Sequence, residues 1–157
     1  MEPLRGFGSV CEEAFTIGEV YRLELASQRS QATHNHYFAA IADAWDNLPE
    51  GLAEQLPTAE HLRKYALIKA GYHDERSIVT SSKAQAQRLA AFVKPMDEYA
   101  VVVVSRCVVT VYTAKSQSMR AMGARAFNAS KQKVLDVIAG LIGTSSDELQ
   151  QAAGKAA

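Results

Sequence analysis

The chain has 157 residues, of which 48% are hydrophobic and 22% are charged, and its 17 acidic residues balance its 17 lysines and arginines. This length is typical of one domain, and the composition is that of a globular protein. No stretch approaches the roughly 18 uninterrupted apolar residues of a membrane span, and the first residues lack the basic start and apolar run of a signal peptide. We therefore expect a cytoplasmic protein that does not bind membranes.

The first segments predict an irregular lead-in followed by a strand. Residues 1 to 16 contain Gly6 and Gly8 and show little periodicity. Residues 18 to 25 alternate apolar and polar side chains, which is the pattern of a half-buried strand.

The stretch Arg29 to Leu48 predicts the central helix of the domain. Its apolar side chains follow helical spacing and include the chain's one tryptophan: Phe38, Ile41, Trp45 and Leu48, with Tyr37 and Ala42 beside them. Ser30 or Thr33 is the candidate N-cap, and Pro49 ends the helix. We expect Phe38 and Trp45 to be buried, and the helix to pack on the sheet.

His34, Asn35 and His36 spell the name of a nuclease class but do not predict a nuclease. Adjacent residues of a helix point about 100° apart, so His34 and His36 diverge by roughly 200° and cannot bind one metal ion together. We interpret them as ordinary side chains of the first helical turns. Cys11 and Cys107 have no metal-binding spacing, and we expect neither a disulfide, a metal nor a cofactor.

The middle of the chain predicts two further helices and a short strand. Residues 48 to 57 form a connection with one loose turn, and Thr58 caps a helix that runs to Ala70 and ends at Gly71. Arg76 to Thr80 favours a short extended run. Ser81 and Ser82 cap the next helix, Lys83 to Val93.

Tyr99 to Thr113 is rich in β-branched residues and predicts a hairpin that turns near Ser105 and Arg106. Its nearly continuous apolar character implies that both faces are covered, or that one face meets a second subunit.

The last third predicts a basic loop, a long helix and a short one. Residues 114 to 123 are small, polar and basic, and they precede a helix from Ala124 to Ile142. Its apolar stripe consists of Phe127, Val134, Ile138 and Leu141. Ser145 and Glu148 form a capping box for a short final helix.

Together these elements predict an α+β fold with a small antiparallel sheet, made of the N-terminal strand and the Val-rich hairpin, packed with several helices. We expect one domain over residues 1–143, followed by a short C-terminal helix and tail over residues 144–157. The hairpin and the long helix carry more apolar surface than one small sheet covers, so we also expect a homodimer.

The charges are sorted along the chain although their sum is zero. Gln31 to Leu62 holds five acids and no base, namely Asp43, Asp46, Glu50, Glu54 and Glu60. Tyr99 to Leu135 holds six bases and no acid. The candidate nucleic-acid contacts lie on the helix after Thr58 and in the basic segment: Arg63, Lys64, Lys69, Lys115, Arg120, Arg125, Lys131 and Lys133.

The order of several segments resembles a phage family. GEVYRLEL (18–25) leads into a helix with Arg29, Ser30, His34, Asn35 and Phe38. HLRKYALIKAGY (61–72), AKSQSMRAM (114–122) and VLDVIAGLIG (134–143) then follow in order. Over roughly residues 18 to 143 this order resembles the Orf/NinB recombination proteins of lambda-like phages and allied phage proteins. The chain departs from them in a longer Ala-rich third helix and in its tail.

The resemblance implies a phage-encoded mediator of homologous recombination that binds single-stranded DNA as a homodimer in the bacterial host cell. Host single-strand-binding or recombination proteins would be further partners. The alternative is a protein-binding module, an inhibitor or adaptor of a host machine, that uses the acidic 31–62 face. We do not expect an enzyme, because no Ser/His/Asp order, catalytic carboxylate pair or metal motif stands out.

Overall fold

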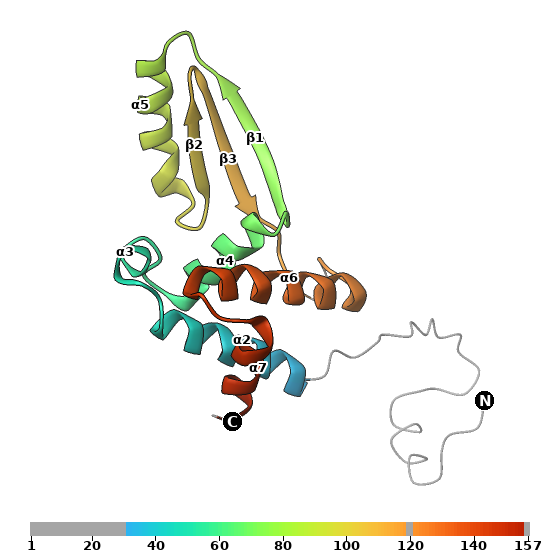
Figure 1. Cartoon of the computed structure of the whole chain (residues 1–157). Coiled ribbons are helices and arrows are strands. Elements are labelled where there is room, and N and C mark those ends of the chain that lie inside the picture. The colour runs from blue at the N-terminus through green and yellow to red at the C-terminus, as the bar shows by residue number, and fades with distance from the viewer. Residues whose placement is uncertain (1–30, 119–120, 156–157) are drawn as a thin grey trace, which may run out of the picture.

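The computed structural model describes residues 31–118 and 121–155 and shows an α+β fold (Figure 1). Its elements are α2 (Gln31–Asp46), α3 (Glu50–Ala53), α4 (Ala59–Lys69), β1 (His73–Val79), α5 (Lys83–Val93), a short 3-10 turn η1 (Lys94–Met96), β2 (Val101–Ser105), β3 (Val108–Ala114), α6 (Ala124–Ile142) and α7 (Ser146–Lys155). The expected strand 18–25 and its lead-in, together with Cys11, Arg29, Ser30 and Arg120, lie outside the described residues.

Local capping signals set the ends of several helices, as the sequence predicted. Thr58 and Ser82 accept hydrogen bonds from backbone N–H groups in the first turns of α4 and α5. Gly143 ends α6 with a left-handed φ of 74°. At α7, the backbone N–H of Glu148 donates to Ser145 Oγ at 3.2 Å while the N–H of Ser145 donates to Glu148 Oε2 at 3.0 Å, which is the reciprocal capping box.

The sheet has three antiparallel strands in the order β1-β3-β2, so β3 is central and β1 and β2 are the edges. The predicted hairpin is confirmed, but it turns at Arg106 and Cys107, one residue later than expected. Arg106 adopts a φ of 54° there, the left-handed region that a tight hairpin turn requires. β1 is longer than the short run predicted over Arg76 to Thr80. Its first half, His73 to Arg76, is polar, so the sequence shows no strand pattern there.

The core lies among helices and not between the sheet and α2. The expected packing of the central helix on the sheet is wrong, because α2 packs against α4, α6 and α7. Contact with the sheet comes instead from α4, which packs on β3, and from α5, which packs on β2 and β3. In Figure 1 the sheet stands above this helical body, with α4 at its base.

The expected burial of Phe38 is also wrong, since 38% of its surface is exposed. The buried face of α2 consists of Tyr37, Ala40, Ile41 and Ala44. Small alanine side chains let neighbouring helices approach α2 closely. The alanine side of α2 therefore faces the core, and Phe38 lies at the edge of the core. Trp45 is half-buried at the edge of the core, where its Nε1–H donates to the carbonyl oxygen of Leu56 at 2.8 Å.

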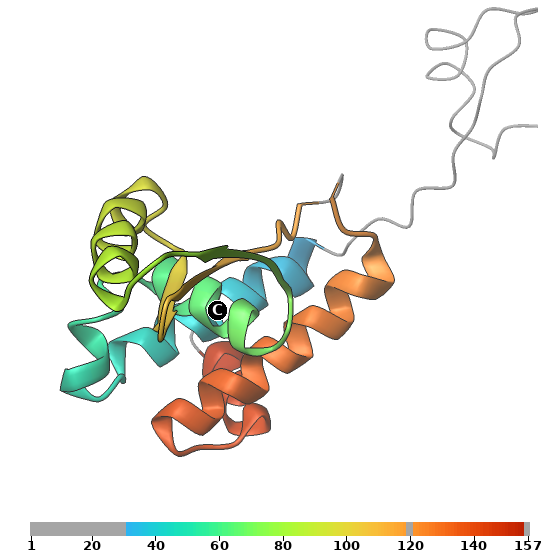
Figure 2. The ribbon, with the colours of Figure 1, turned by 90° about the horizontal axis from the view of Figure 1, so that it is seen from above.

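The two faces of the sheet differ in how far other elements cover them. Side chains alternate across a strand, so Val109 shares a face with Val104 and Ile78. Val109 is fully buried, because α5 packs on this face. In the view from above, α5 lies on one side of the strands and the long helix α6 lies on the other side (Figure 2).

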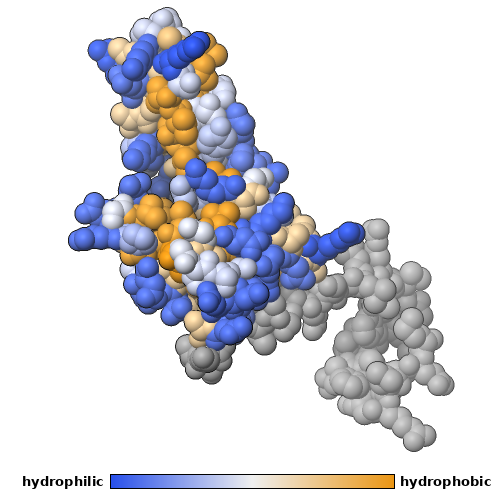
Figure 3. Space-filling model, in the orientation of Figure 1, coloured by the Kyte–Doolittle hydropathy of each residue, from blue (hydrophilic) through white to orange (hydrophobic). Residues whose placement is uncertain are grey.

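The opposite face, which we call the open face, carries Val79, Val103, Val108 and Tyr112. Val79 is 77% exposed and Val103 is 45% exposed. Figure 3 shows a hydrophobic stripe that runs along the sheet down to the helical body. The apolar stripe of α6 is by contrast used inside the helical body, where Phe127, Val134 and Ile138 are buried.

A buried polar network joins four separate parts of the helical body. The guanidinium of Arg63 donates to both carboxylate oxygens of Glu60 at 2.7 and 2.5 Å, and its Nη1 donates to Gln117 Oε1. The same oxygen accepts from the hydroxyl of Tyr37 at 3.3 Å, and Gln117 Nε2 donates to Ser130 Oγ at 2.8 Å. One glutamine therefore links α2, α4 and α6 to the loop after β3.

Ionisation in this network follows from burial and hydrogen bonding. Hydrogen bonds from Arg63 hold the pKa of Glu60 below its usual value. Burial opposes the charge of Arg63, but the bonds to Glu60 and its charge outweigh burial and raise the pKa of Arg63. Burial raises the pKa of Tyr37 from 10.0 to about 12.

Replacing Gln117 by alanine should lower the free energy of unfolding by about 1–3 kcal/mol, because Arg63, Tyr37 and Ser130 would each lose a partner in a buried site. Urea denaturation measures this change. Gln87, an exposed residue of α5, provides the matched control, and its replacement by alanine should change stability by less than about 0.5 kcal/mol. Equal effects at the two sites would contradict a structural role for the network.

Alkaline pH should weaken the fold through Tyr37. The pKa is about 12 in the folded state against 10.0 for an ordinary tyrosine, so the stabilisation is fully present below pH 10. It is lost as pH rises from 10 to 12, where the unfolded chain releases this proton first. Unfolding measured across that range should therefore show a shallower decline for Tyr37→Phe than for wild type. An equally steep decline in Tyr37→Phe and wild type would contradict the role of Tyr37.

Candidate functional site

The structure separates the predicted basic contacts into surface residues and one core residue. Arg63 is only 7% exposed, and its guanidinium is held by Glu60 and Gln117. The expectation that it contacts a nucleic acid is therefore not supported. Among residues 31–118 and 121–155, ion pairs join Arg63 to Glu60 and Lys115 to Asp74, and none involves Lys64, Lys69 or Lys133.

Two of the predicted lysines, both on α4, lie over tyrosine rings. The Nζ of Lys64 lies 5.9 Å from the centre of the Tyr99 ring, and that of Lys69 lies 5.5 Å from the Tyr65 ring. Both tyrosines are half-buried, so part of each side chain stays accessible. A cation above an aromatic ring is stabilised by the electron density of the ring face.

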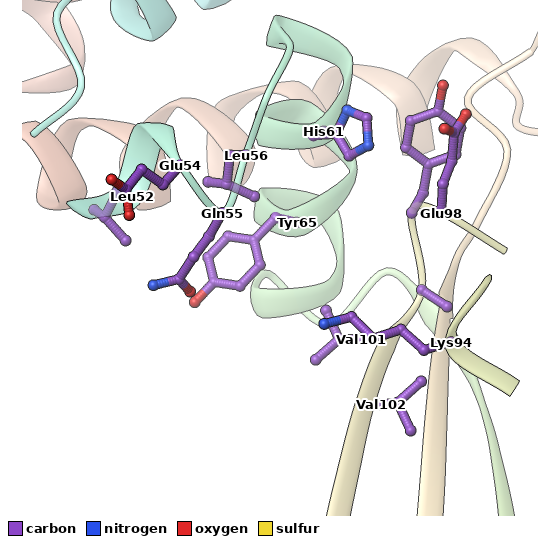
Figure 4. Close-up of a pocket in the computed structure, with 12 residues that line it drawn as sticks. Leu52, Glu54, Gln55, Leu56, His61, Tyr65, Lys94, Glu98, Val101 and Val102 are labelled. Atoms are coloured by element: carbon purple, nitrogen blue, oxygen red, sulfur yellow. The ribbon is translucent and has the colours of Figure 1, made fainter. Parts of the chain in front are cut away.

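Tyr65 and Tyr99 both line a groove of about 500 Å³ between the α3–α4 region and the start of β2 (Figure 4). We call this feature the tyrosine groove. Leu52, Leu56, Val101 and Val102 provide its apolar lining. His61 stacks on Tyr99 with ring centres 4.8 Å apart, and its Nδ1 lies 2.8 Å from Thr58 Oγ1. The volume lies within the usual range of small-ligand pockets, about 300–1,000 Å³.

Charged groups stand around the tyrosine groove. Lys94, at the end of α5, lines it together with Glu54 and Glu98. A hydrogen bond to Glu98 raises the pKa of Tyr99. In Figure 4 Glu54 and Gln55 lie on one side of Tyr65, and Lys94 reaches toward Tyr65 from the other side. The residues that line the groove thus carry two carboxylates and one ammonium group, while Lys64 and Lys69 lie over the two tyrosine rings.

A second group of lysines surrounds Tyr72, at the junction between α4 and β1; we call it the Tyr72 cluster. The Nζ of Lys133 lies 5.5 Å from the centre of the Tyr72 ring. The backbone N–H of Lys115 donates to the carbonyl oxygen of Tyr72 at 3.0 Å, and its ammonium group lies 3.8 Å from the carboxylate of Asp74. Both lysine side chains are exposed, so they can reach a ligand without disturbing the core.

The remaining predicted bases join neither group. Arg125 is exposed in the first turn of α6, beside a shallow surface hollow lined mostly by glycine and alanine. Lys131 is half-buried on the same helix. Of the described predicted bases, Lys64 and Lys69 thus lie over the two tyrosines of the tyrosine groove, while Lys115 and Lys133 belong to the Tyr72 cluster.

The predicted acidic face is smaller than the sequence suggested. Asp46, Glu50 and Glu54 are exposed, Asp43 is half-buried, and Glu60 is committed to Arg63. His34 packs against the rings of Phe38 and Phe127, with centre distances of 4.7 and 5.9 Å. Within residues 31–118 and 121–155, no group of three or more His, Cys, Asp or Glu side chains is placed to hold a metal ion.

Sequence reasoning missed Lys94, Tyr65, Tyr72 and Tyr99 as site residues. The sequence favours packing roles for Tyr65, on the apolar side of its helix, and for Tyr99, at the start of the β-branched run, and it assigns no role to Tyr72. Lys94 lies next to Pro95 in the segment that ends α5, where nothing in the sequence distinguishes it from a solvated surface lysine. The one local signal is the spacing of Tyr65 and Lys69. They stand four residues apart on one helix, which places a lysine beside a tyrosine on the helix surface.

Comparisons with protein-family models, curated proteins and solved structures find no match to this chain. In the described residues, no helix has both the length and the hydropathy needed to cross a lipid bilayer.

Proposed function

We propose that the protein binds single-stranded DNA without acting on it chemically. One observation carries the proposal: three lysines lie over half-exposed tyrosine rings in the described structure, Lys64 over Tyr99, Lys69 over Tyr65 and Lys133 over Tyr72. A base that stacks on such a ring would displace the ammonium group from above it, and the lysine would then stand close enough to neutralise a neighbouring phosphate.

The combination favours single strands over duplexes for a physical reason. Phosphate neutralisation supplies sequence-independent affinity for either form of DNA. Stacking on an aromatic ring requires a free base face, which a duplex hides, and contributes about 1–3 kcal/mol per base. A surface that uses both contributions therefore discriminates in favour of the unpaired strand.

A protein that holds single strands in this way would serve as an accessory factor in homologous recombination, in line with the resemblance to phage recombination mediators. It would work in the cytoplasm of the bacterial host beside host single-strand-binding or recombination proteins. Binding would require no cofactor.

Mutation of Lys115 and Lys133 together to alanine should weaken binding to single-stranded DNA at low salt. The slope of log K against log[salt] should become shallower by about 1.4, at roughly 0.7 for each lost phosphate contact on a single strand. Fluorescence anisotropy across a salt series measures this slope. Stability should change little, because exposed charges contribute little to folding.

The matched control removes two positive charges elsewhere. Lys83 and Arg88 are both exposed on α5, and neither contributes to the tyrosine groove or the Tyr72 cluster. Their double replacement by alanine should keep the wild-type slope. If the wild-type protein shows no salt-sensitive binding to single strands, the proposal fails. The exposed Asp46, Glu50 and Glu54 would then favour the alternative, a module that binds a basic protein surface.

We also propose that the protein forms a homodimer through the β1 edge of its sheet. The pairs Thr80–Cys107 and Tyr72–Lys115 hydrogen-bond across to β3, so alternation turns the N–H and C=O groups of His73, Glu75, Ser77 and Val79 outward. The same four side chains stand on the open face. Within residues 31–118 and 121–155 no strand pairs with this edge, and an edge of this kind is a template for another strand.

The charges of β1 bear on the register of a second copy. Two antiparallel copies centred on Ser77 would place Arg76 of one opposite Ile78 of the other, and Glu75 opposite Val79, with no like charges opposite each other. Centring on Arg76 would set two arginines directly opposite each other, which destabilises a sheet, whereas centring on Glu75 would set two glutamates opposite each other between two Asp74–Arg76 pairs. The zero formal net charge of the chain also favours self-association.

Ser77→Pro should convert the dimer to a folded monomer. The Ser77 N–H points away from β3, so proline at this position leaves the β1–β3 hydrogen bonds in place and blocks pairing at the edge. Sedimentation velocity measures the assembly state, and circular dichroism checks the fold. Ser77→Thr, which suits a strand, should remain dimeric. A wild-type monomer, or a dimer that survives the proline, would remove the proposed interface.

A further inference from the structure

We infer that the tyrosine groove is a binding site for one base of the single strand, and that it prefers a base with an exocyclic amine, such as cytosine, over thymine. This inference rests on the proposed function and adds a site and a base preference to it. It depends on three features of the groove: its aromatic wall, its apolar lining and the separation of its charges.

The aromatic wall and the lining suit the two faces of a flat heterocycle. Tyr65 comes from α4, and Tyr99 comes from the segment before β2, so two separate elements present rings to one groove. Tyr65 also packs against the core, which holds its ring in place before a ligand arrives. Leu56 and Val101 add apolar contacts. A base of one or two rings fits within about 500 Å³, whereas a duplex does not.

The charges of the groove are arranged for a nucleotide and not for a phosphate alone. Glu54 and Lys94 lie on opposite sides of Tyr65 (Figure 4). A base stacked on Tyr65 would take the place of the exposed Lys69 ammonium above this ring, which would then be free to meet a phosphate. Its edge would point toward Glu54 and its sugar-phosphate toward Lys94. A phosphate inside the groove would instead meet the carboxylates of Glu54 and Glu98.

The carboxylate of Glu54 provides the base preference. An ionised carboxylate only accepts hydrogen bonds, so it pairs with the exocyclic amine of cytosine. Thymine presents a carbonyl oxygen at the equivalent position, which the carboxylate repels. Glu98 is the weaker candidate for this role, because its carboxylate already interacts with the hydroxyl of Tyr99.

The test measures binding of the full chain to fluorescent oligo(dC) and oligo(dT) of about 10 nucleotides, within the range of single-strand site sizes. A mildly alkaline buffer keeps cytosine unprotonated. Wild type should bind oligo(dC) about tenfold more tightly, which is the discrimination expected of one well-formed base contact. Tyr65→Leu, which keeps an apolar side chain against the core, should weaken binding of both oligonucleotides about tenfold by removing the stacking face.

Glu54→Gln isolates the base preference. The glutamine amide can either accept from cytosine or donate to thymine, so the ratio of the two affinities should fall to near one while oligo(dT) binding does not weaken. Glu50→Gln is the matched control: it removes the same charge from an exposed residue of α3 that does not line the groove, and it should keep the wild-type ratio.

The outcomes separate this inference from the function on which it rests. Equal affinity for oligo(dC) and oligo(dT), or unchanged binding in Tyr65→Leu, overturns the base site even if binding still depends on salt and on Lys115 and Lys133. The absence of any salt-sensitive binding to either oligonucleotide by wild type overturns the proposed function itself.

Discussion

The helical body depends on the buried guanidinium of Arg63. A charge at 7% exposure is unfavourable unless its donors are paired, and here Glu60 and Gln117 receive them. Glu60 lies one turn away on α4, but Gln117 comes from the loop after β3, so the core cannot close until the hairpin has reached the helices. The network thereby fixes the base of the sheet to α2, α4 and α6, and with it the positions of Tyr72 and Lys115.

Short-range rules were enough to predict most of the elements. Thr58, Ser82, Gly143 and the Ser145–Glu148 box act through hydrogen bonds within a few residues, so the boundaries of α4, α5 and α6 and the start of α7 follow from the local sequence. Two features depend on distant partners and were not predictable. The polar strand β1 exists because β3 pairs with it, and α2 turns Phe38 outward because other helices meet its alanines.

In the candidate site, too, the local sequence predicts some features and distant contacts decide others. Lys64, Lys69, Lys115 and Lys133 were recognisable as basic residues, yet only the fold shows which of them lie beside a tyrosine. The sequence offers no means of separating Arg63 from Lys64, its neighbour on α4, although one is a core residue and the other borders a groove. The tyrosine groove itself joins residues from the α3–α4 region to residues of η1 and the start of β2, at least 29 positions away. Such a juxtaposition is decided by packing and not by any local pattern.

The alternation of hydrogen bonds along β1 has a consequence for solvent exchange. Amide protons of Asp74, Arg76 and Ile78 are held by the central strand, whereas those of Glu75, Ser77 and Val79 face outward. In an isolated chain, deuterium would therefore enter this strand with a two-residue period, fast at odd positions and slow at even ones. A second strand on that edge would erase the period by slowing the odd positions alone. The strand thus reports, amide by amide, whether its outer edge is occupied.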